Sequence, residues 1–156
     1  MKETSVMRDR PVQIRRPTEA DWPRMLEILE MVNYHRIGGS EMAAFPLSDC
    51  FVAEIDGQLA GLAGYRILDT EEAKTTLMAV DPAFRGAGIG LRLQQARMDF
   101  LREKGLRRLY TNCDDEQVIR WYARHFGYRP TGARIPKTEP FGLPDQTEWT
   151  TIVCDL

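Results

Sequence analysis

The chain has 156 residues, of which 21 are basic and 23 acidic, and its formal net charge is −2 at pH 7. This length suits one domain with its own core, and the balanced charge gives no electrostatic reason to expect nucleic acid or a membrane surface as partner. Hydrophobic residues make up 43% and charged residues 28%, a composition that excludes a disordered chain.

Signals for export, membrane insertion and metal binding are missing from the sequence. Cys50, Cys113 and Cys154 form no CxxC pair, so they predict three free thiols in a reducing cytoplasm rather than a disulfide framework or zinc site. No apolar run reaches the roughly 20 residues of a membrane helix. The first residues lack the apolar core of a signal peptide. We therefore expect a cytoplasmic protein without metal or membrane partner, with a frayed end over 1–10 and one domain over 11–156.

The first elements are a short strand and a helix. Alternating residues over 12–16 predict the strand. Thr18 and Asp21 then stand at capping-box spacing, and an amphipathic pattern predicts a helix over 18–33. Residues 40–48 fit either a loop or a short second helix.

Three strands in a meander follow. Apolar runs over 50–55 and 58–68 flank Asp56-Gly57, which is a strong signal for a tight hairpin. A further strand is expected over 73–80.

The C-terminal half alternates helices and strands. A helix is predicted over 88–104 and ends at Gly105, because apolar residues recur at spacings of four, three and four: Ile89, Leu93, Ala96 and Phe100. A strand is expected over 106–112, followed by a helix to about 126 that Gly127 ends. This helix is capped by Asp114 or Asp115, with Val118, Tyr122 and Phe126 on one stripe.

Weaker strands are expected near 128–135 and 147–155. This order predicts an α/β fold in which a mixed, mostly antiparallel central sheet carries helices on both faces.

Residues 85–90, Arg-Gly-Ala-Gly-Ile-Gly, lie between a strand and a long helix. The first N–H groups of a helix lack intrahelical partners and favour anions, and glycines let a phosphate approach them. A P-loop is excluded because Leu91 and Arg92 follow, and Leu91 also breaks a dinucleotide fingerprint. Two readings remain: a pyrophosphate site, or a turn that packs the helix closely on the sheet.

Arg85-x-x-Gly88-x-Gly90 resembles the R/Q-x-x-G-x-G/A signature of the GNAT family of acyl-CoA-dependent N-acetyltransferases. The segment 77–90 is similar to the family's strand and short proline-containing link. The segment 118–128, with a tyrosine and a final Gly-Tyr, resembles its tyrosine-bearing helix. The resemblance extends over about residues 12–155 and implies a GNAT-like fold.

The resemblance also implies a coenzyme A or acetyl-CoA cosubstrate. The loop amides would hold the pyrophosphate, and a strand that diverges from 106–112 would hydrogen-bond the pantetheine arm. The residues implied in cofactor binding are Met78, Ala79, Val80, Arg85, Gly86, Ala87, Gly88, Ile89, Gly90 and Leu91, together with Asn112 and Asp115. Asp115 has the alternative of serving only as a helix cap.

Tyr122 matches the family's tyrosine, which implies a general acid for the leaving thiolate; its alternative is a core tyrosine. It stands five residues before Gly127, one more than the family's usual spacing. A backbone N–H near 78–80 could polarise the thioester carbonyl. The segment 74–80 carries no carboxylate, so the sequence assigns no general base.

The resemblance implies that the region after the first helix covers the acceptor. Tyr34, His35 and Arg36 are candidates for substrate contact, with a solvated loop as the alternative. The expected activity is acetyl transfer from acetyl-CoA to a primary amine of a small molecule by direct attack in a ternary complex. The sequence does not name the acceptor, so an amino sugar or a protein amine is an alternative. Alternatives are a noncatalytic coenzyme A-binding module and an enzyme for another acyl-CoA; a homodimer is possible through exposed sheet edges.

Overall fold

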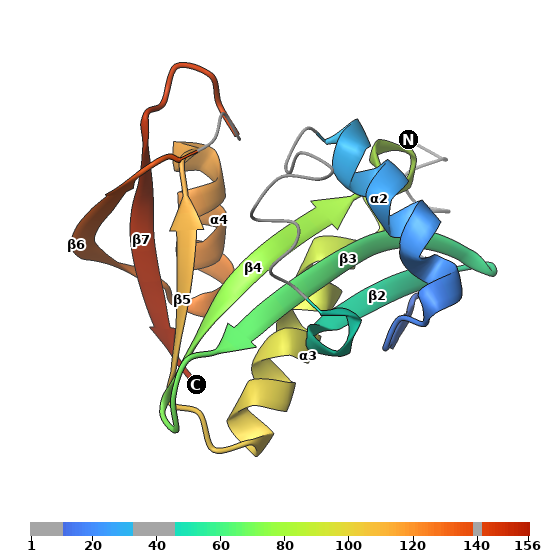
Figure 1. Cartoon of the computed structure of the whole chain (residues 1–156), viewed down its shortest axis with the longest axis horizontal. Coiled ribbons are helices and arrows are strands. Elements are labelled where there is room, and N and C mark those ends of the chain that lie inside the picture. The colour runs from blue at the N-terminus through green and yellow to red at the C-terminus, as the bar shows by residue number, and fades with distance from the viewer. Residues whose placement is uncertain (1–10, 33–45, 139–141) are drawn as a thin grey trace. The chain divides into compact units, whose positions relative to one another are not determined.

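The computed structural model describes residues 11–32, 46–138 and 142–156 (Figure 1). The chain divides into two compact units: unit 1 comprises Met1–Tyr65 and Thr76–Arg97, and unit 2 comprises Arg66–Thr75 and Met98–Leu156. The strands follow the hydrogen-bonded order β1-β2-β3-β4-β5-β7-β6 in a seven-stranded sheet. Among the described pairings β4–β5 is parallel and the others are antiparallel, which confirms the mixed, mostly antiparallel sheet.

Unit 1 begins with the predicted strand, helix and hairpin. Its elements are β1 (Gln13–Arg15), η1 (Glu19–Asp21), α2 (Trp22–Met31), η3 (Leu47–Asp49), β2 (Cys50–Ile55), most of β3 (Gln58–Ile67), the end of β4 (Glu72–Val80), η4 (Pro82–Phe84) and the start of α3 (Ile89–Glu103). At the β2–β3 turn, Asp56 and Gly57 have φ values of 51° and 78°. Both lie in the left-handed region that a two-residue hairpin turn requires, which confirms the hairpin.

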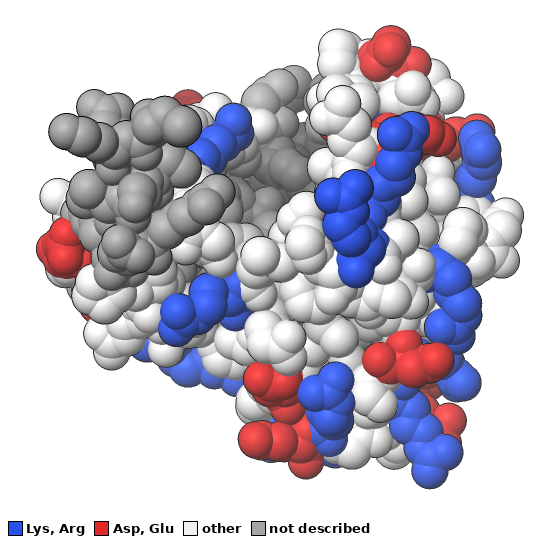
Figure 2. Space-filling view, turned by 180° about the vertical axis from the view of Figure 1, so that it is seen from behind, with Lys and Arg blue, Asp and Glu red and all other residues white. Residues whose placement is uncertain are grey.

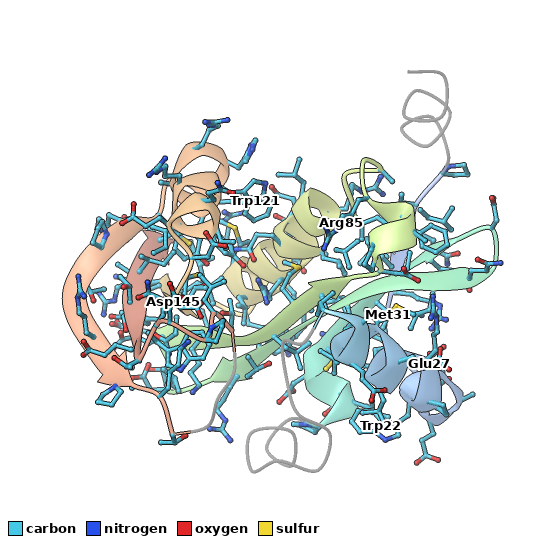
Figure 3. All side chains as sticks on the ribbon, turned by 90° about the horizontal axis from the view of Figure 1, so that it is seen from above. Trp22, Glu27, Met31, Arg85, Trp121 and Asp145 are labelled. Atoms are coloured by element: carbon cyan, nitrogen blue, oxygen red, sulfur yellow. The ribbon has the colours of Figure 1, made fainter. Side chains whose placement is uncertain are left out.

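Two helices cover opposite faces of the unit 1 strands. α2 buries Met25, Ile28 and Leu29 against Val52 and Leu62 on one face. The start of α3 buries Ile89 and Leu93 on the other face, against Ala53, Ile55, Ala60 and Ala63. Figures 1 and 3 show α2 and α3 on either side of these strands. The expected arrangement of helices on both faces is thus confirmed in this unit.

The buried stripe of α3 differs from the predicted one. Ile89 and Leu93 are buried as expected, but Ala96 and Phe100 are only half-buried. Gln94 and Arg97 are fully buried instead. They lie four residues after Gly90 and Leu93, respectively. A pattern based on apolar residues alone misses this face because polar side chains occupy part of it.

Unit 2 holds the start of β4, the rest of α3, β5 (Arg108–Cys113), α4 (Glu116–Phe126), β6 (Arg129–Pro136) and β7 (Glu148–Asp155). β4 and β5 pair in parallel, with Glu72 opposite Arg108 and Lys74 opposite Tyr110. β7 then pairs antiparallel with β5 and with β6. The expected strands and the glycine stop of α4 at Gly127, whose φ is 70°, are confirmed.

The predicted stripe of α4 is buried only in part. Tyr122 is buried and Phe126 is half-buried, but Val118 is 37% exposed. Val118 lies in the first turn of α4, one residue after Gln117, whose backbone N–H is capped by Asp115. The buried stripe of this helix therefore begins only after its first turn.

The start of the first helix is tied to β1 by an ion pair. Arg15 donates to both carboxylate oxygens of Asp21, at 2.8 and 3.0 Å, and the Thr18 backbone N–H donates to Asp21 Oδ2 at 2.7 Å. The hydrogen bond from Arg15 is the main reason why the pKa of Asp21 is lowered from 3.8 to about 2. The carboxylate is therefore stabilised in its charged form in the folded state.

We expect Asp21→Asn to lower the free energy of unfolding by about 1 kcal/mol at pH 7, because solvent screens this partly exposed pair. A lowered pKa stabilises the fold above the unfolded-state value of about 4, and this contribution disappears as the pH falls towards 2. Urea unfolding from pH 7 to pH 2 should therefore show parent and variant converging at low pH. Glu19→Gln, at an exposed position of the same turn, is the control. A constant difference at every pH would contradict this explanation.

Candidate functional site

The glycine segment of unit 1 is held at its start by Asp81. This buried residue follows β4, and its backbone N–H donates to Ala60 O at 2.8 Å. Its carboxylate accepts from Ala83 N at 2.9 Å and from Arg24 Nη2 of α2 at 2.5 Å. Phe84 then inserts into the core beside Ile89. The backbone is thus anchored on both sides of the segment that leads from β4 into α3.

Two glycines of this segment adopt backbone conformations that disfavour other residues. Gly86 has a φ of 93° and Gly88 a φ of 73°. A Cβ added at Gly88 would meet no protein atom within 4 Å. Gly88 is therefore not a site of close packing between helix and sheet. The space in front of its backbone is open, as a ligand-binding turn requires.

Close packing between α3 and the sheet occurs instead at Gly61 of β3. A Cβ there would lie 3.0 Å from Ala79 O, 3.0 Å from Ile89 Cγ2 and 3.2 Å from Leu93 Cδ1. For Gly88, the two interpretations of residues 85–90 can therefore be compared directly. Gly61 packs closely against α3, whereas Gly88 has open space at its Cβ position and a positive φ.

The loop presents donors to solvent. Arg85 is exposed and lies beside the start of α3 in Figure 3, on the opposite side of the unit 1 strands from the labelled α2 residues Trp22, Glu27 and Met31. Ile89 is buried and fixes the first turn of α3, while Leu91 is 38% exposed. The first N–H groups of α3 have no intrahelical acceptor, so this end of the helix favours a negative charge.

The end of β4 alternates between the two cores of unit 1. Leu77 and Ala79 join the core under α2, whereas Met78 and Val80 pack at the edge of the core under α3. The side chains at the end of β4 therefore pack in or against the two cores. If these residues bind a ligand, the backbone groups must do so, as the resemblance implies. The expected divergence of this strand from β5 stays a prediction.

Unit 2 contains the predicted tyrosine. Tyr122 is 4% exposed, and its ring centroid lies 4.9 Å from that of Tyr128 and 4.9 Å from that of Trp121. Tyr128 accepts a hydrogen bond from Thr111 Oγ1 at 3.0 Å, and Thr75 Oγ1 donates to Thr111 Oγ1 at 3.2 Å. Tyr122 thus lies in an aromatic cluster next to a chain of hydroxyl groups.

The two other predicted residues of unit 2 have clear structural partners. Asp115 is the N-cap of α4 and accepts from Gln117 N at 2.8 Å, so the capping alternative is met. Asn112 Oδ1 accepts from Thr151 Oγ1 of β7 at 2.8 Å. Both residues are held in place, and a contact of either with coenzyme A stays a prediction.

Sequence reasoning missed a carboxylate that organises the connection between β6 and β7. Asp114 Oδ2 accepts from Lys137 Nζ at 2.8 Å and from Leu143 N at 2.7 Å. The Lys137 ammonium also lies 4.6 Å from the ring centroid of Trp149. A Cβ on Gly142 would collide with the Asp114 carboxylate. The signal in the sequence was Asp114 itself, which is not needed as a cap beside Asp115.

The described residues offer little support for a cysteine nucleophile or a metal site. Burial, assisted by Asp49, raises the pKa of Cys50 to about 12, so its thiol stays protonated at neutral pH and is a poor nucleophile. Within the described ranges no three His, Cys, Asp or Glu side chains gather to hold a metal ion, and no helix there is long and apolar enough to cross a membrane. The substrate candidates Tyr34, His35 and Arg36 lie outside the described residues.

Charges of both signs are mixed on the face of the molecule shown in Figure 2. Local ion pairs between opposite charges also occur in both units. Arg24 pairs with Glu27 at 3.1 Å, and Arg120 pairs with Glu116 at 3.1 Å. Exposed pairs of this kind contribute little to stability.

Comparison with known proteins identifies the family. The model of the acetyltransferase (GNAT) family matches residues 15–128, which include the glycine loop and Tyr122. The chain belongs to the acetyltransferase (GNAT) family. It is therefore an acetyl-CoA-dependent acyltransferase, and the family resemblance of its sequence motifs is confirmed.

Individual relatives agree with this assignment. A Bacillus subtilis (strain 168) protein, provisionally named as a ribosomal protein bS18-alanine N-acetyltransferase, is 29% identical over 113 residues, covering 72% of this chain and 74% of that protein. The crystal structure of Ard1 from Thermoplasma volcanium superposes with a TM-score of 0.77 at 21% identity, covering 93% of this chain and 97% of that one. A GNAT family acetyltransferase from Elizabethkingia anophelis with acetyl-CoA bound has a TM-score of 0.74 at 15% identity, covering 93% and 98%. The two structures support the GNAT fold.

Proposed function

We propose that this GNAT family member transfers the acetyl group of acetyl-CoA to a primary amine, and that residues 85–91 bind the pyrophosphate of the coenzyme. One observation carries the proposal: Gly88 adopts a φ of 73° with open space in front of it, directly before the N-terminus of α3. Exposed Arg85 supplies a cation that suits a phosphate oxygen. Backbone N–H groups, the helix end and the guanidinium together form a site for an anion.

The proposed reaction is a direct attack. The neutral amine nitrogen attacks the thioester carbonyl carbon, the C–S bond breaks, and the thiolate of coenzyme A leaves. Tyr122 donates its phenolic proton to that thiolate and regains a proton from solvent, which also receives the proton lost by the amine. A backbone N–H within Met78 to Val80 stabilises the negative charge that develops on the carbonyl oxygen.

The acceptor was expected from the sequence to be a small molecule. The Bacillus subtilis relative is named for an alanine of a ribosomal protein, which supports the alternative acceptor, the amine of a protein chain. Both acceptors present a primary amine to the same acetyl donor. The choice between them is therefore one of acceptor recognition rather than of reaction type.

We expect Gly88→Glu to abolish acetyl-CoA binding, because its carboxylate would both occupy the loop and repel the pyrophosphate. Gly57→Glu is a matched control: Gly57 also has a positive φ, of 78°, with no atom near an added Cβ, but it lies in the β2–β3 turn. The two variants should lose similar stability, roughly 1–2 kcal/mol, from the left-handed backbone alone. Calorimetric titration should then show binding by the parent and Gly57→Glu only. Equal binding by all three proteins would refute the proposed loop site.

We expect Tyr122→Phe to lower kcat by about 10²–10⁴-fold with little change in the KM for acetyl-CoA, because a proton donor acts mainly in the transition state. Tyr128→Phe is the control, because it removes the hydroxyl of the adjacent ring and with it the hydrogen bond that Thr111 donates. It should reduce thermal stability but not kcat. If both variants keep the parent's kcat, Tyr122 is a core residue.

We expect thiol release from acetyl-CoA in the presence of a primary amine. The panel contains a peptide that begins with alanine, the same peptide with a blocked N-terminus, a free amino acid and an amino sugar. The blocked peptide should be inert because it lacks a nucleophilic amine. A faster rate with the free peptide assigns a protein acceptor, and a faster rate with a small amine supports the sequence-based expectation. Coenzyme binding without turnover of any amine would favour the noncatalytic alternative.

A further inference from the structure

A guanidinium is completely buried in unit 1 beside the end of β4. Arg97 of α3 is 0% exposed and has the largest volume among the fully buried side chains of the described residues. Its Nη1 donates to the backbone carbonyls of Gly64 in β3 and Leu77 in β4, each at 2.9 Å. Its Nε donates to Gln94 Oε1 at 3.0 Å, and its Nη2 donates to the same oxygen. These three acceptors are neutral oxygens.

This arrangement is unusual for a sheet. Carbonyls of neighbouring strands in a sheet normally accept from the N–H groups of the partner strand. Here one carbonyl from each strand accepts from a single nitrogen of a helix side chain. Four residues after Leu93 the amphipathic pattern calls for an apolar side chain, and burial of a cation is unfavourable unless its donors are satisfied. Arg97 therefore has a role that a space-filling apolar residue at the same position could not perform.

The consequence for β4 follows from peptide geometry. The Leu77–Met78 peptide is trans, and a planar trans peptide directs its C=O and its N–H to opposite sides. When Arg97 holds the Leu77 carbonyl toward α3, it also fixes the direction of the Met78 N–H. Met78 begins the segment whose backbone is proposed to bind the pantetheine arm and the thioester carbonyl. The guanidinium thus determines the direction of a donor that it does not itself touch.

We propose that Arg97 is a positioning residue that aims the Met78 N–H at the thioester carbonyl of acetyl-CoA. This inference rests on the proposed function and assigns a residue outside the glycine motif to the same reaction. Arg97 is separate from the pyrophosphate loop, so its loss should affect polarisation of the acetyl group more than overall affinity for the coenzyme.

The test measures the infrared stretch of the thioester carbonyl in bound acetyl-CoA, using the difference between unlabelled and carbonyl-¹³C acetyl groups. Hydrogen bonding to the carbonyl lowers this frequency. The proteins compared are the parent, Arg97→Met, Arg97→Lys and Arg92→Met. Arg92 is a matched control: it is an exposed arginine of α3 whose Nη2 donates to the Val12 carbonyl at 3.0 Å. Affinity for coenzyme A is measured by calorimetry on the same samples.

We expect the parent and Arg92→Met to show the same low frequency. Arg97→Met should lose most of the shift while its Kd for coenzyme A stays within about threefold. Arg97→Lys should show a partial shift, because one ammonium can reach fewer of the acceptors than a planar guanidinium. With the amine that supports turnover, kcat per coenzyme-binding site should fall by about 10- to 100-fold in Arg97→Met. Counting rate per binding site removes any loss that comes only from unfolded protein.

An unchanged carbonyl frequency and an unchanged kcat per binding site in Arg97→Met would overturn the inference, even if that variant melts at a lower temperature. If Arg97→Met does not fold, the same criterion applies to Arg97→Lys, which keeps the charge and must still lose part of the shift. A parent protein that does not bind acetyl-CoA would instead refute the proposed function. A parent that binds without any carbonyl shift would refute the backbone donor while leaving the pyrophosphate loop intact.

Discussion

The close contact of α3 with β3 at Gly61 is the constraint on which the rest of unit 1 depends. The first turn of α3 can bury Ile89 and Leu93 only because this strand position has no side chain. Interiors are packed too densely for a methyl group to be inserted there without displacement of the helix. Because the helix axis is fixed at this point, its N-terminus is also fixed at the end of β4. One turn further on, Arg97 is held within reach of two strand carbonyls.

Gly61 and Gly88 are glycines for opposite physical reasons. Gly61 is required because there is no room for a side chain, whereas Gly88 has ample room and is required by its φ of 73°. Asp81, anchored by Arg24 and by the N–H of Ala83, fixes the entry to the loop. Because Asp81 on one side and α3 on the other are held in place, the short exposed turn between them is preorganised. Such a turn can bind an anion without a large loss of conformational entropy on association.

Much of this could be predicted from the sequence because its signals are local. Asp56-Gly57 specified a hairpin, and Gly105 and Gly127 specified helix ends, through backbone preferences of a few neighbouring residues. Tertiary contacts carry no such local signal. Nothing near Arg97 in the sequence indicates that its partners lie 20 and 33 residues away, in two strands. The ion pair between Lys137 and Asp114 was missed for the same reason, since 23 residues separate them.

The burial of Arg97 also bears on why this side chain is present at all. Replacing a buried charge with an apolar residue of similar volume is often neutral or stabilising when its partners can be satisfied in another way. The partners here are the carbonyls of Gly64 and Leu77, which are buried residues of two neighbouring strands of the sheet and cannot turn to water. An apolar residue would leave them without this donor, and the strands would have to shift to find another. The cation therefore stabilises one particular path of the β4 backbone, and a different local path would present different N–H groups to the acetyl donor.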